Sequence, residues 1–117
     1  MEAKEFTVFS SLLSDVYAKA FGEQISRLPH GKAQTLCWLI HEATGELLSY
    51  KTLGNYVAAV LAGNSSAINP SDATLAILAQ FVSGNDAHQA GRHEMRAGAY
   101  AAWYKYRSGI LTRSLAA

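Results

Sequence analysis

The chain has 117 residues, half of them apolar and 16% charged, with a net charge of +1. These values exclude a disordered chain and favour one small folded domain. The single cysteine, Cys37, excludes an internal disulfide framework, and its apolar neighbours predict a buried thiol in a cytoplasmic protein. A membrane partner and a secretory signal are not expected, because no apolar run approaches the roughly 18 residues of a span and the start MEAKEFTVFSS has no apolar core.

The charge is unevenly distributed along the chain. Residues 1–85 contain five basic and seven acidic side chains, a balance of −2, whereas residues 86–117 contain five basic and two acidic ones, a balance of +3. Affinity for nucleic acid depends largely on neutralising phosphates. The basic side chains therefore concentrate in the C-terminal segment.

The first two predicted helices lie in the N-terminal half. Apolar residues recur at steps of three and four from about Glu5 to Phe21, which predicts a helix that stops at Gly22. A connector follows, with Pro29 and Gly31 as helix breakers. The segment KAQTLCWLIHEATG, residues 32–45, predicts a second helix with one apolar face.

The third predicted helix lies between a capping serine, Ser49, and a glycine stop, Gly63. One helical face is apolar, which predicts the face that packs on the core. That face consists of Leu53, Tyr56, Val57, Val60 and Leu61.

The fourth predicted helix has a clear start signal. Asn69 can cap it, Pro70 suits the first helical position, Asp72 suits the positive helix end, and Gly84 stops it. A fifth helix is predicted over residues 87–108. The sequence therefore predicts an all-α fold, a compact bundle of about five helices. It comprises a domain over residues 1–85 and an amphipathic C-terminal helix over 86–117, packed on the domain or docking a partner.

The segments SYKTLGNY (residues 49–56) and NPSDATLAILAQFV (residues 69–82) resemble the helix-turn-helix domains of the lambda-repressor and Cro type. The resemblance covers about residues 32–83 and implies a helix-turn-helix core. The sequence departs from the family in a longer segment before Gly63 and in Cys37, Trp38 and Leu39 of the preceding helix. A looser similarity to small N-terminal helical modules of Bacteroidota proteins carries no function with it. The positions that match the lambda-repressor and Cro type are Ser49, Thr52, Leu53, Tyr56, Pro70, Ser71, Thr74, Leu75, Leu78 and Ala79.

The resemblance implies a set of residues that would contact DNA from the start of the third helix. Asn55 could pair with adenine and Lys51 could reach guanine or a phosphate. The alternative is an ordinary surface, since past Asn55 the outer face offers only Ala58, Ala59 and Ala62, a composition that suits close packing against another helix or subunit equally well. The candidate DNA-contact residues are Gln34, Ser49, Tyr50, Lys51, Thr52 and Asn55.

The predicted fifth helix carries arginine and aromatic residues at steps of three and four, so that they share one face. Such a stripe suits a protein interface or homo-oligomer, single-stranded nucleic acid, or a membrane surface. The alternative is that Trp103 and Tyr100 close the core while the arginines are solvated. The candidate partner-contact residues are Arg92, Arg96, Tyr100, Trp103 and Arg107.

No catalytic or metal-binding pattern is evident in the sequence. His88 and His93 are five residues apart, one more than the spacing that best places two ligands on one helix face. No nucleophile elbow or phosphate-binding glycine loop occurs. We therefore expect no enzyme activity, no metal and no cofactor. Two functions remain open: DNA binding or a regulatory adaptor role on a helix-turn-helix fold, and protein interaction or assembly on that fold without DNA.

Overall fold

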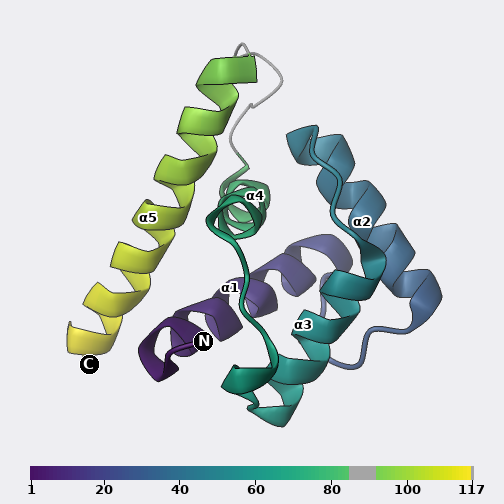
Figure 1. The fold of residues 1–117 in the computed structure, drawn as a ribbon, viewed down its shortest axis with the longest axis horizontal. Helices are drawn as coiled ribbons and strands as arrows, with labels where there is room; N and C mark the ends of the chain where they lie inside the picture. Colours follow the sequence, from purple (N-terminus) through teal and green to yellow (C-terminus); the bar gives the residue numbers. More distant parts are fainter. Residues whose placement is uncertain (85–91, 117) are drawn as a thin grey trace.

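The structure, a computed structural model, describes residues 1–84 and 92–116, with side chains for 1–84 and 101–113. Within these ranges the chain is helical and contains no strand (Figure 1). The prediction of an all-α bundle is confirmed. The helices are α1 (Ala3–Phe21), α2 (His30–Thr44), α3 (Tyr50–Ala62), the short 3₁₀ helix η1 (Ser65–Ala67), α4 (Asp72–Ser83) and α5 (Arg92–Ala116).

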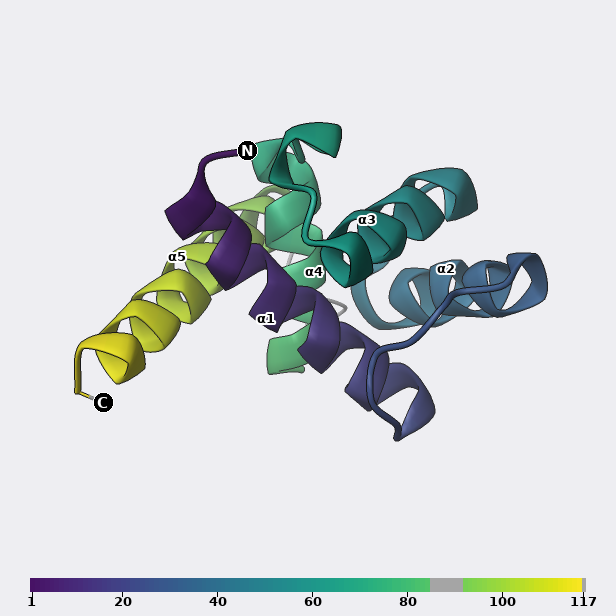
Figure 2. The same cartoon turned by 90° about the horizontal axis from the view of Figure 1, so that it is seen from below.

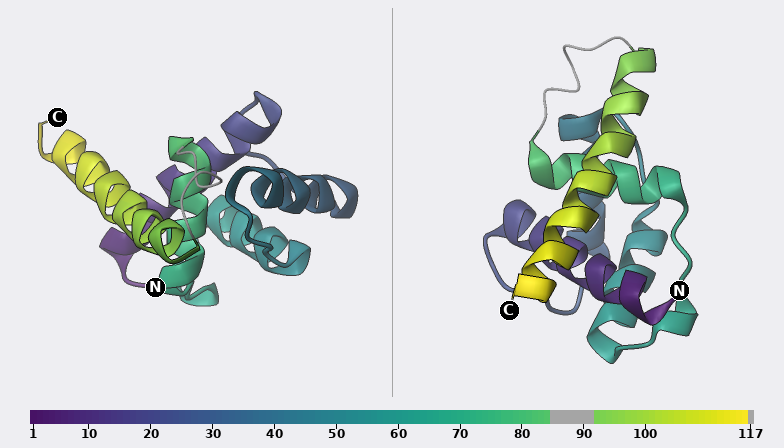
Figure 3. Two further views of the ribbon diagram at one scale, coloured as in Figure 1. Left: turned by 90° about the horizontal axis from the view of Figure 1, so that it is seen from above. Right: turned by 90° about the vertical axis from the view of Figure 1, so that its left-hand side faces the viewer.

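Helices α1 and α4 lie in the middle of the bundle. Helix α4 contacts α1, α2 and α5, and α1 also contacts α3 and α5. Figure 2 and the left panel of Figure 3 show α5 on one side of this central pair and α2 with α3 on the other. The fold therefore has two separate outer surfaces, one on α5 and one on α2 and α3.

The core is built on the apolar face of α1, where residues three and four apart share one side of the helix. Six side chains of this face are buried: Val8, Phe9, Leu12, Leu13, Val16 and Tyr17. Phe9 meets Tyr56 of α3 edge to face, with ring centroids 5.3 Å apart. Burying a side chain of this size stabilises the fold by about 1.5–3 kcal/mol, so this face of α1 contributes a large part of the stability of the core.

The helix ends match the glycine stops that the sequence predicts. Gly22, Gly45, Gly63 and Gly84 follow the four N-terminal helices, have φ angles of 67° to 78°, and donate their N–H groups to carbonyls of the last turn. A residue with a Cβ is strained in this left-handed conformation, which explains why glycine ends each helix.

The predicted helix starts are wrong at α2 and α4. Helix α2 begins at His30, so Gly31, which was predicted to be a helix breaker, lies inside the helix. Helix α4 is capped by Ser71, whose hydroxyl accepts the Thr74 N–H at 3.2 Å, rather than by Asn69. Pro70 precedes the cap and is buried, so it is not the first helical residue. Ser49 does occupy the N-cap position of α3, but its side chain makes no capping hydrogen bond. The residue type alone does not determine which of several nearby polar side chains caps a helix.

Helix α5 differs from the predicted range of 87–108. It continues past Gly109 to Ala116, while residues 87–91 lie outside the described part of the chain. Ile110 and Leu111 are half-buried and pack against the core, so the buried face continues beyond the predicted end. None of the described helices combines the length and the apolar character that crossing a membrane requires.

Candidate nucleic-acid interface

The first turns of α2 and α3 lie side by side. The ring of His30, the first residue of α2, meets the ring of Tyr50, the first residue of α3, edge to face with centroids 4.6 Å apart. This contact brings Tyr50 and its neighbours Ser49, Lys51 and Thr52 to the start of α2, where Gln34 lies one turn further along. Most of the residues predicted to contact DNA therefore gather at two adjacent helix N-termini, which we call the paired N-termini.

The paired N-termini present backbone N–H groups without a capping side chain. The N-cap positions of α2 and α3, Pro29 and Ser49, make no side-chain cap, and neither first turn contains an acidic residue. Helices α1 and α4 differ, because Glu5 and Asp72 lie in their first turns. Uncapped N–H groups and the helix dipole leave partial positive charge at a helix start. Two such starts side by side favour an anion such as a phosphate.

Two exposed cations lie near the paired N-termini: Arg27, shortly before α2, and Lys51, in the first turn of α3. Lys32 lies in the first turn of α2 but is occupied within the fold. It forms an ion pair with Glu23 and donates to the Tyr17 hydroxyl at 2.7 Å. The hydrogen bond with Glu23, followed by that with Tyr17, raises the pKa of the Lys32 ammonium. Lys32 therefore fastens the start of α2 to α1, and Arg27 and Lys51 are available to a ligand.

The outer face of α3 continues from the paired N-termini toward Gly63. Lys51, Asn55, Ala58 and Ala62 are exposed at steps of four, three and four, so they form one face of the helix. Thr52 beside them is half-buried. Only Lys51 and Asn55 on this face can donate hydrogen bonds from their side chains to a nucleic acid.

The predicted burial of α3 is wrong at two positions. Ala59, expected on the outer face, is only 5% exposed, whereas Leu61, expected on the apolar stripe, is 49% exposed. The two residues lie on opposite edges of the stripe. Periodicity gives the centre of a buried face but not which edge the neighbouring elements cover.

The connector between α2 and α3 determines where α3 begins. Figure 1 shows that residues 45–49 run back along α2, so that α3 starts near the beginning of α2 rather than near its end. The buried Thr44 hydroxyl donates to the Ile40 carbonyl at 2.7 Å and accepts the Glu46 N–H at 3.2 Å, which fixes the start of the connector. A helix-turn-helix has a turn of about three or four residues, so the connection here is longer.

The candidate partner-contact residues of α5 serve the fold where the structure describes them. Trp103 is 4% exposed and belongs to the core, so the alternative of core closure holds for this residue. Arg107 donates to both oxygens of Glu5 on α1. The prediction of an exposed Trp103 anchor is therefore wrong, because its ring is buried in the core. Arg92, Arg96 and Tyr100 lie outside the residues whose side chains are described.

Sequence reasoning missed the exposed apolar side chains of α2, α3 and their connector. Trp38 is 58% exposed and Leu47 is 71% exposed, in addition to Leu61. The sequence did contain a signal for the exposure of Trp38. Leu36, Cys37 and Ile40 form the buried face of α2, and the helical turn directs position 38 away from that face. On α5, Tyr104 is 59% exposed.

The described residues contain no group of three or more histidine, cysteine, aspartate or glutamate side chains that could hold a metal ion. His88 and His93 lie outside the residues whose side chains are described. Cys37 is buried, as predicted, and burial raises the pKa of its thiol. A thiol of this kind is a poor nucleophile, because the thiolate is the reactive form.

Comparison of the chain with protein-family models, with curated proteins and with solved structures finds no match. A functional assignment therefore depends on the geometry and chemistry of the surfaces described above.

Proposed function

We propose that the protein binds the backbone of double-stranded DNA through the paired N-termini of α2 and α3. The observation that carries the proposal is the contact between His30 and Tyr50, which places two helix starts without caps or acidic residues next to each other. Phosphates are the anions of DNA, and backbone N–H groups at helix N-termini are common phosphate contacts.

In this proposal the side chains around the paired N-termini make different contacts with DNA. Arg27 and Lys51 contact phosphates, because both are exposed cations next to the two helix starts. Asn55 lies one turn after Lys51 on the same face, where its amide can donate to and accept from an adenine. Ser49 and Gln34 supply further donors to the backbone.

The charge near the paired N-termini limits the affinity of one copy. Each neutralised phosphate contributes about −0.9 to the slope of log K against log salt. Arg27 and Lys51 together therefore predict a slope of about −2, which is shallow for a sequence-specific protein. The proposed activity thus needs two copies on one duplex, or a further domain, to reach useful affinity at physiological salt.

The experiment is a fluorescence anisotropy titration of a labelled duplex at low salt, repeated over a range of salt concentrations. Lys51→Ala should weaken binding and reduce the salt slope by about one unit. The matched control is Lys105→Ala, because it removes the same charge from α5 on the other side of the bundle (Figure 3). Equal weakening by both variants would mean that binding follows net charge alone, and an absence of binding would remove the proposal.

A second candidate function is self-assembly, in which two copies meet through α2, α3 and their connector. It is favoured by the exposure of Trp38, Leu47 and Leu61, since large apolar side chains left exposed on α2, α3 and their connector can be buried by a second copy. Aromatic residues such as tryptophan are frequent anchors of interfaces.

Light scattering tests this second candidate. The wild type should be a dimer and Trp38→Ser a monomer, whereas Tyr104→Ser, which removes an equally exposed aromatic ring from α5, should stay dimeric. Dissociation by Tyr104→Ser alone would place the interface on the C-terminal helix instead. A monomeric wild type at about 100 μM would exclude assembly of useful strength, since a Kd above this value corresponds to less than about 5.5 kcal/mol.

A further inference from the structure

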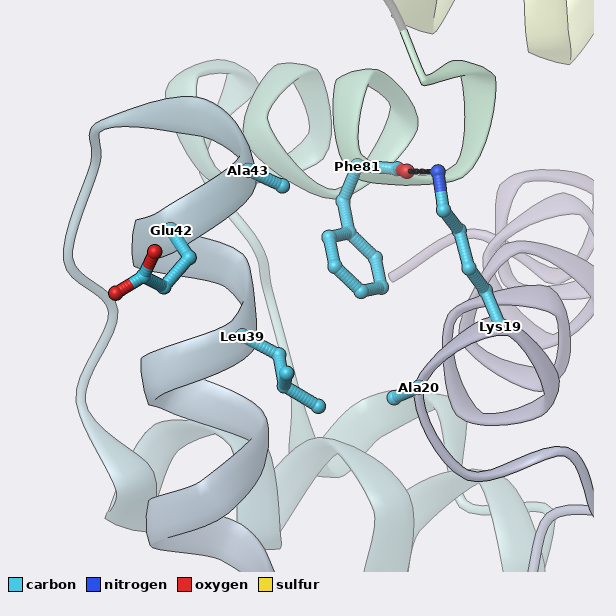
Figure 4. Close-up of a pocket in the computed structure, with 6 residues that line it drawn as sticks. All are labelled: Lys19, Ala20, Leu39, Glu42, Ala43 and Phe81. Carbon is cyan, nitrogen blue, oxygen red and sulfur yellow. Dashed lines mark hydrogen bonds between the residues drawn. The ribbon is translucent and has the colours of Figure 1, made fainter.

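A cavity opens where α2 meets the central helices α1 and α4. Its volume is about 320 Å³, and Figure 4 shows its walls as side chains from all three helices. It lies away from the paired N-termini, nearer the C-terminal ends of the three helices. The residues that line it are Lys19 and Ala20 of α1, Leu39, Glu42 and Ala43 of α2, and Phe81 of α4.

The cavity exists because short side chains meet at this seam. Ala20 and Ala43 point toward it from two different helices, and neither is long enough to fill it (Figure 4). Leu39 and Phe81 form apolar walls on either side. The hollow is open to solvent, with the exposed Lys19 at its rim, so a small guest can enter it from the surface.

The ammonium of Lys19 is held at the edge of the cavity. Its Nζ donates to the Phe81 carbonyl at 2.5 Å and lies 5.2 Å from the centroid of the Phe81 ring. Gly84 leaves room for it, because a Cβ at that position would lie only 3.3 Å from Nζ. An ammonium has three donors, and among the described residues only the Phe81 carbonyl accepts from Lys19, which leaves two N–H groups for another acceptor.

The acidic residue of the lining does not oppose an anion in the cavity. In Figure 4 the carboxylate of Glu42 points away from the cavity, on the far side of α2 from Phe81. The polar group that faces a guest is therefore a cation, and the remaining walls are apolar.

We propose that this cavity binds a small apolar monocarboxylate, with its carboxylate on Lys19 and its ring or branched chain between Leu39, Ala43 and Phe81. The volume lies at the lower end of the roughly 300–1,000 Å³ typical of ligand pockets, which suits a guest of about ten non-hydrogen atoms. A charge-assisted hydrogen bond to a positioned ammonium supplies the specificity for the carboxylate. The site is separate from the paired N-termini and stands whether or not the protein binds DNA.

The test is an NMR titration of the ¹⁵N-labelled protein with phenylacetate as the probe. The resonances of Ala20, Leu39, Ala43 and Phe81 should shift and saturate, with a Kd on the order of 1 mM, as expected for so small a ligand. Phenethylamine, which has a similar size and the opposite charge, should bind at least about tenfold more weakly because it meets the Lys19 ammonium. Equal binding of the two probes, or no saturable shift, would overturn the proposal.

Two variants test separately whether binding depends on the apolar space of the cavity and on the Lys19 ammonium. Ala43→Leu should fill the cavity and abolish the shifts, whereas Ala58→Leu, the same change on the exposed face of α3, should leave them intact. Lys19→Met should weaken phenylacetate about tenfold or more through loss of the ammonium. Lys4→Met, at the exposed start of α1, is its control. Each variant must keep the wild-type circular dichroism spectrum, and unchanged binding in both Ala43→Leu and Lys19→Met would place the ligand elsewhere.

Discussion

Arg107 of the last helix holds Glu5 of the first helix through two N–H groups. Its Nη2 lies 2.5 Å and its Nε 2.8 Å from Oε1 of Glu5, and Nε also lies 3.1 Å from Oε2. The hydrogen bonds from Arg107 lower the pKa of the Glu5 carboxyl below its ordinary value of 4.5. The pair fastens α5 to the start of α1 at a distance of 102 residues along the chain.

The ion pair predicts a stability that depends on pH. Arg107→Gln should lower the free energy of unfolding slightly at pH 7, because both side chains are partly exposed and water screens their attraction. Since folding lowers the pKa of Glu5, the contribution is present above pH 4.5 and is lost as the pH falls through the lower pKa of the folded state.

Urea unfolding of the double-mutant cycle with Glu5→Gln measures this coupling. The coupling energy should be present at pH 7 and smaller at an acidic pH well below 4.5. A coupling of the same size at both pH values would mean that the contact stabilises the fold through packing of the arginine stem rather than through charge.

Among the described side chains of α5, we expect substitution of Trp103 to cause the largest loss of stability. Trp103→Ala should cost about 3–5 kcal/mol, because the buried ring leaves a cavity in the core. Tyr104→Ala removes an aromatic ring from the next position, which is exposed, and should change stability by less than about 0.5 kcal/mol. Thermal unfolding followed by circular dichroism compares them, and similar losses for both would contradict the burial of Trp103.

The number of α-helices and the C-terminal ends of α1 to α4 could be predicted from the sequence because they depend on local chemistry. Gly22, Gly45, Gly63 and Gly84 end their helices through a backbone conformation that neighbouring residues do not alter much. The contact between the starts of α2 and α3 could not be predicted in the same way. It depends on the path of residues 45–49, which is set by Thr44 and by packing across the fold.

The burial of single residues on a helix could be predicted only in part. Trp103 lies on a face that also carries Arg107, so the pattern fits an exposed stripe as well as a core position. In the structure the two side chains on this face have different environments. Trp103 is buried in the core, whereas the Arg107 guanidinium extends beyond the core to Glu5. Ala59 and Leu61 show the same limit, since the edge of a stripe is decided by tertiary contacts.

The serines at the N-cap positions of α3 and α4 are expected to respond differently to the same substitution. Ser71→Ala should destabilise the protein by about 1 kcal/mol, because the hydroxyl accepts the Thr74 N–H at the start of α4. Ser49→Ala should have little effect on stability, because the Ser49 side chain makes no cap. Urea unfolding of both variants is the measurement, and an equal loss in both would show that Ser49 caps α3 in solution.

Replacing the buried Thr44 hydroxyl by a methyl group is expected to lower the stability of the protein, because a methyl group cannot form the hydrogen bonds of the hydroxyl. Thr44→Val keeps the shape of the side chain but leaves the Glu46 N–H without its acceptor, so we expect a loss of about 1–3 kcal/mol. Thr35→Val is a matched control, because the Thr35 hydroxyl also donates to a carbonyl four residues earlier but is exposed to water, which can replace it. Urea unfolding should therefore separate the two variants, and exchange of the Glu46 amide hydrogen should accelerate only in Thr44→Val. Equal stability of the two variants would mean that the connector is held by the packing of Leu48 rather than by Thr44.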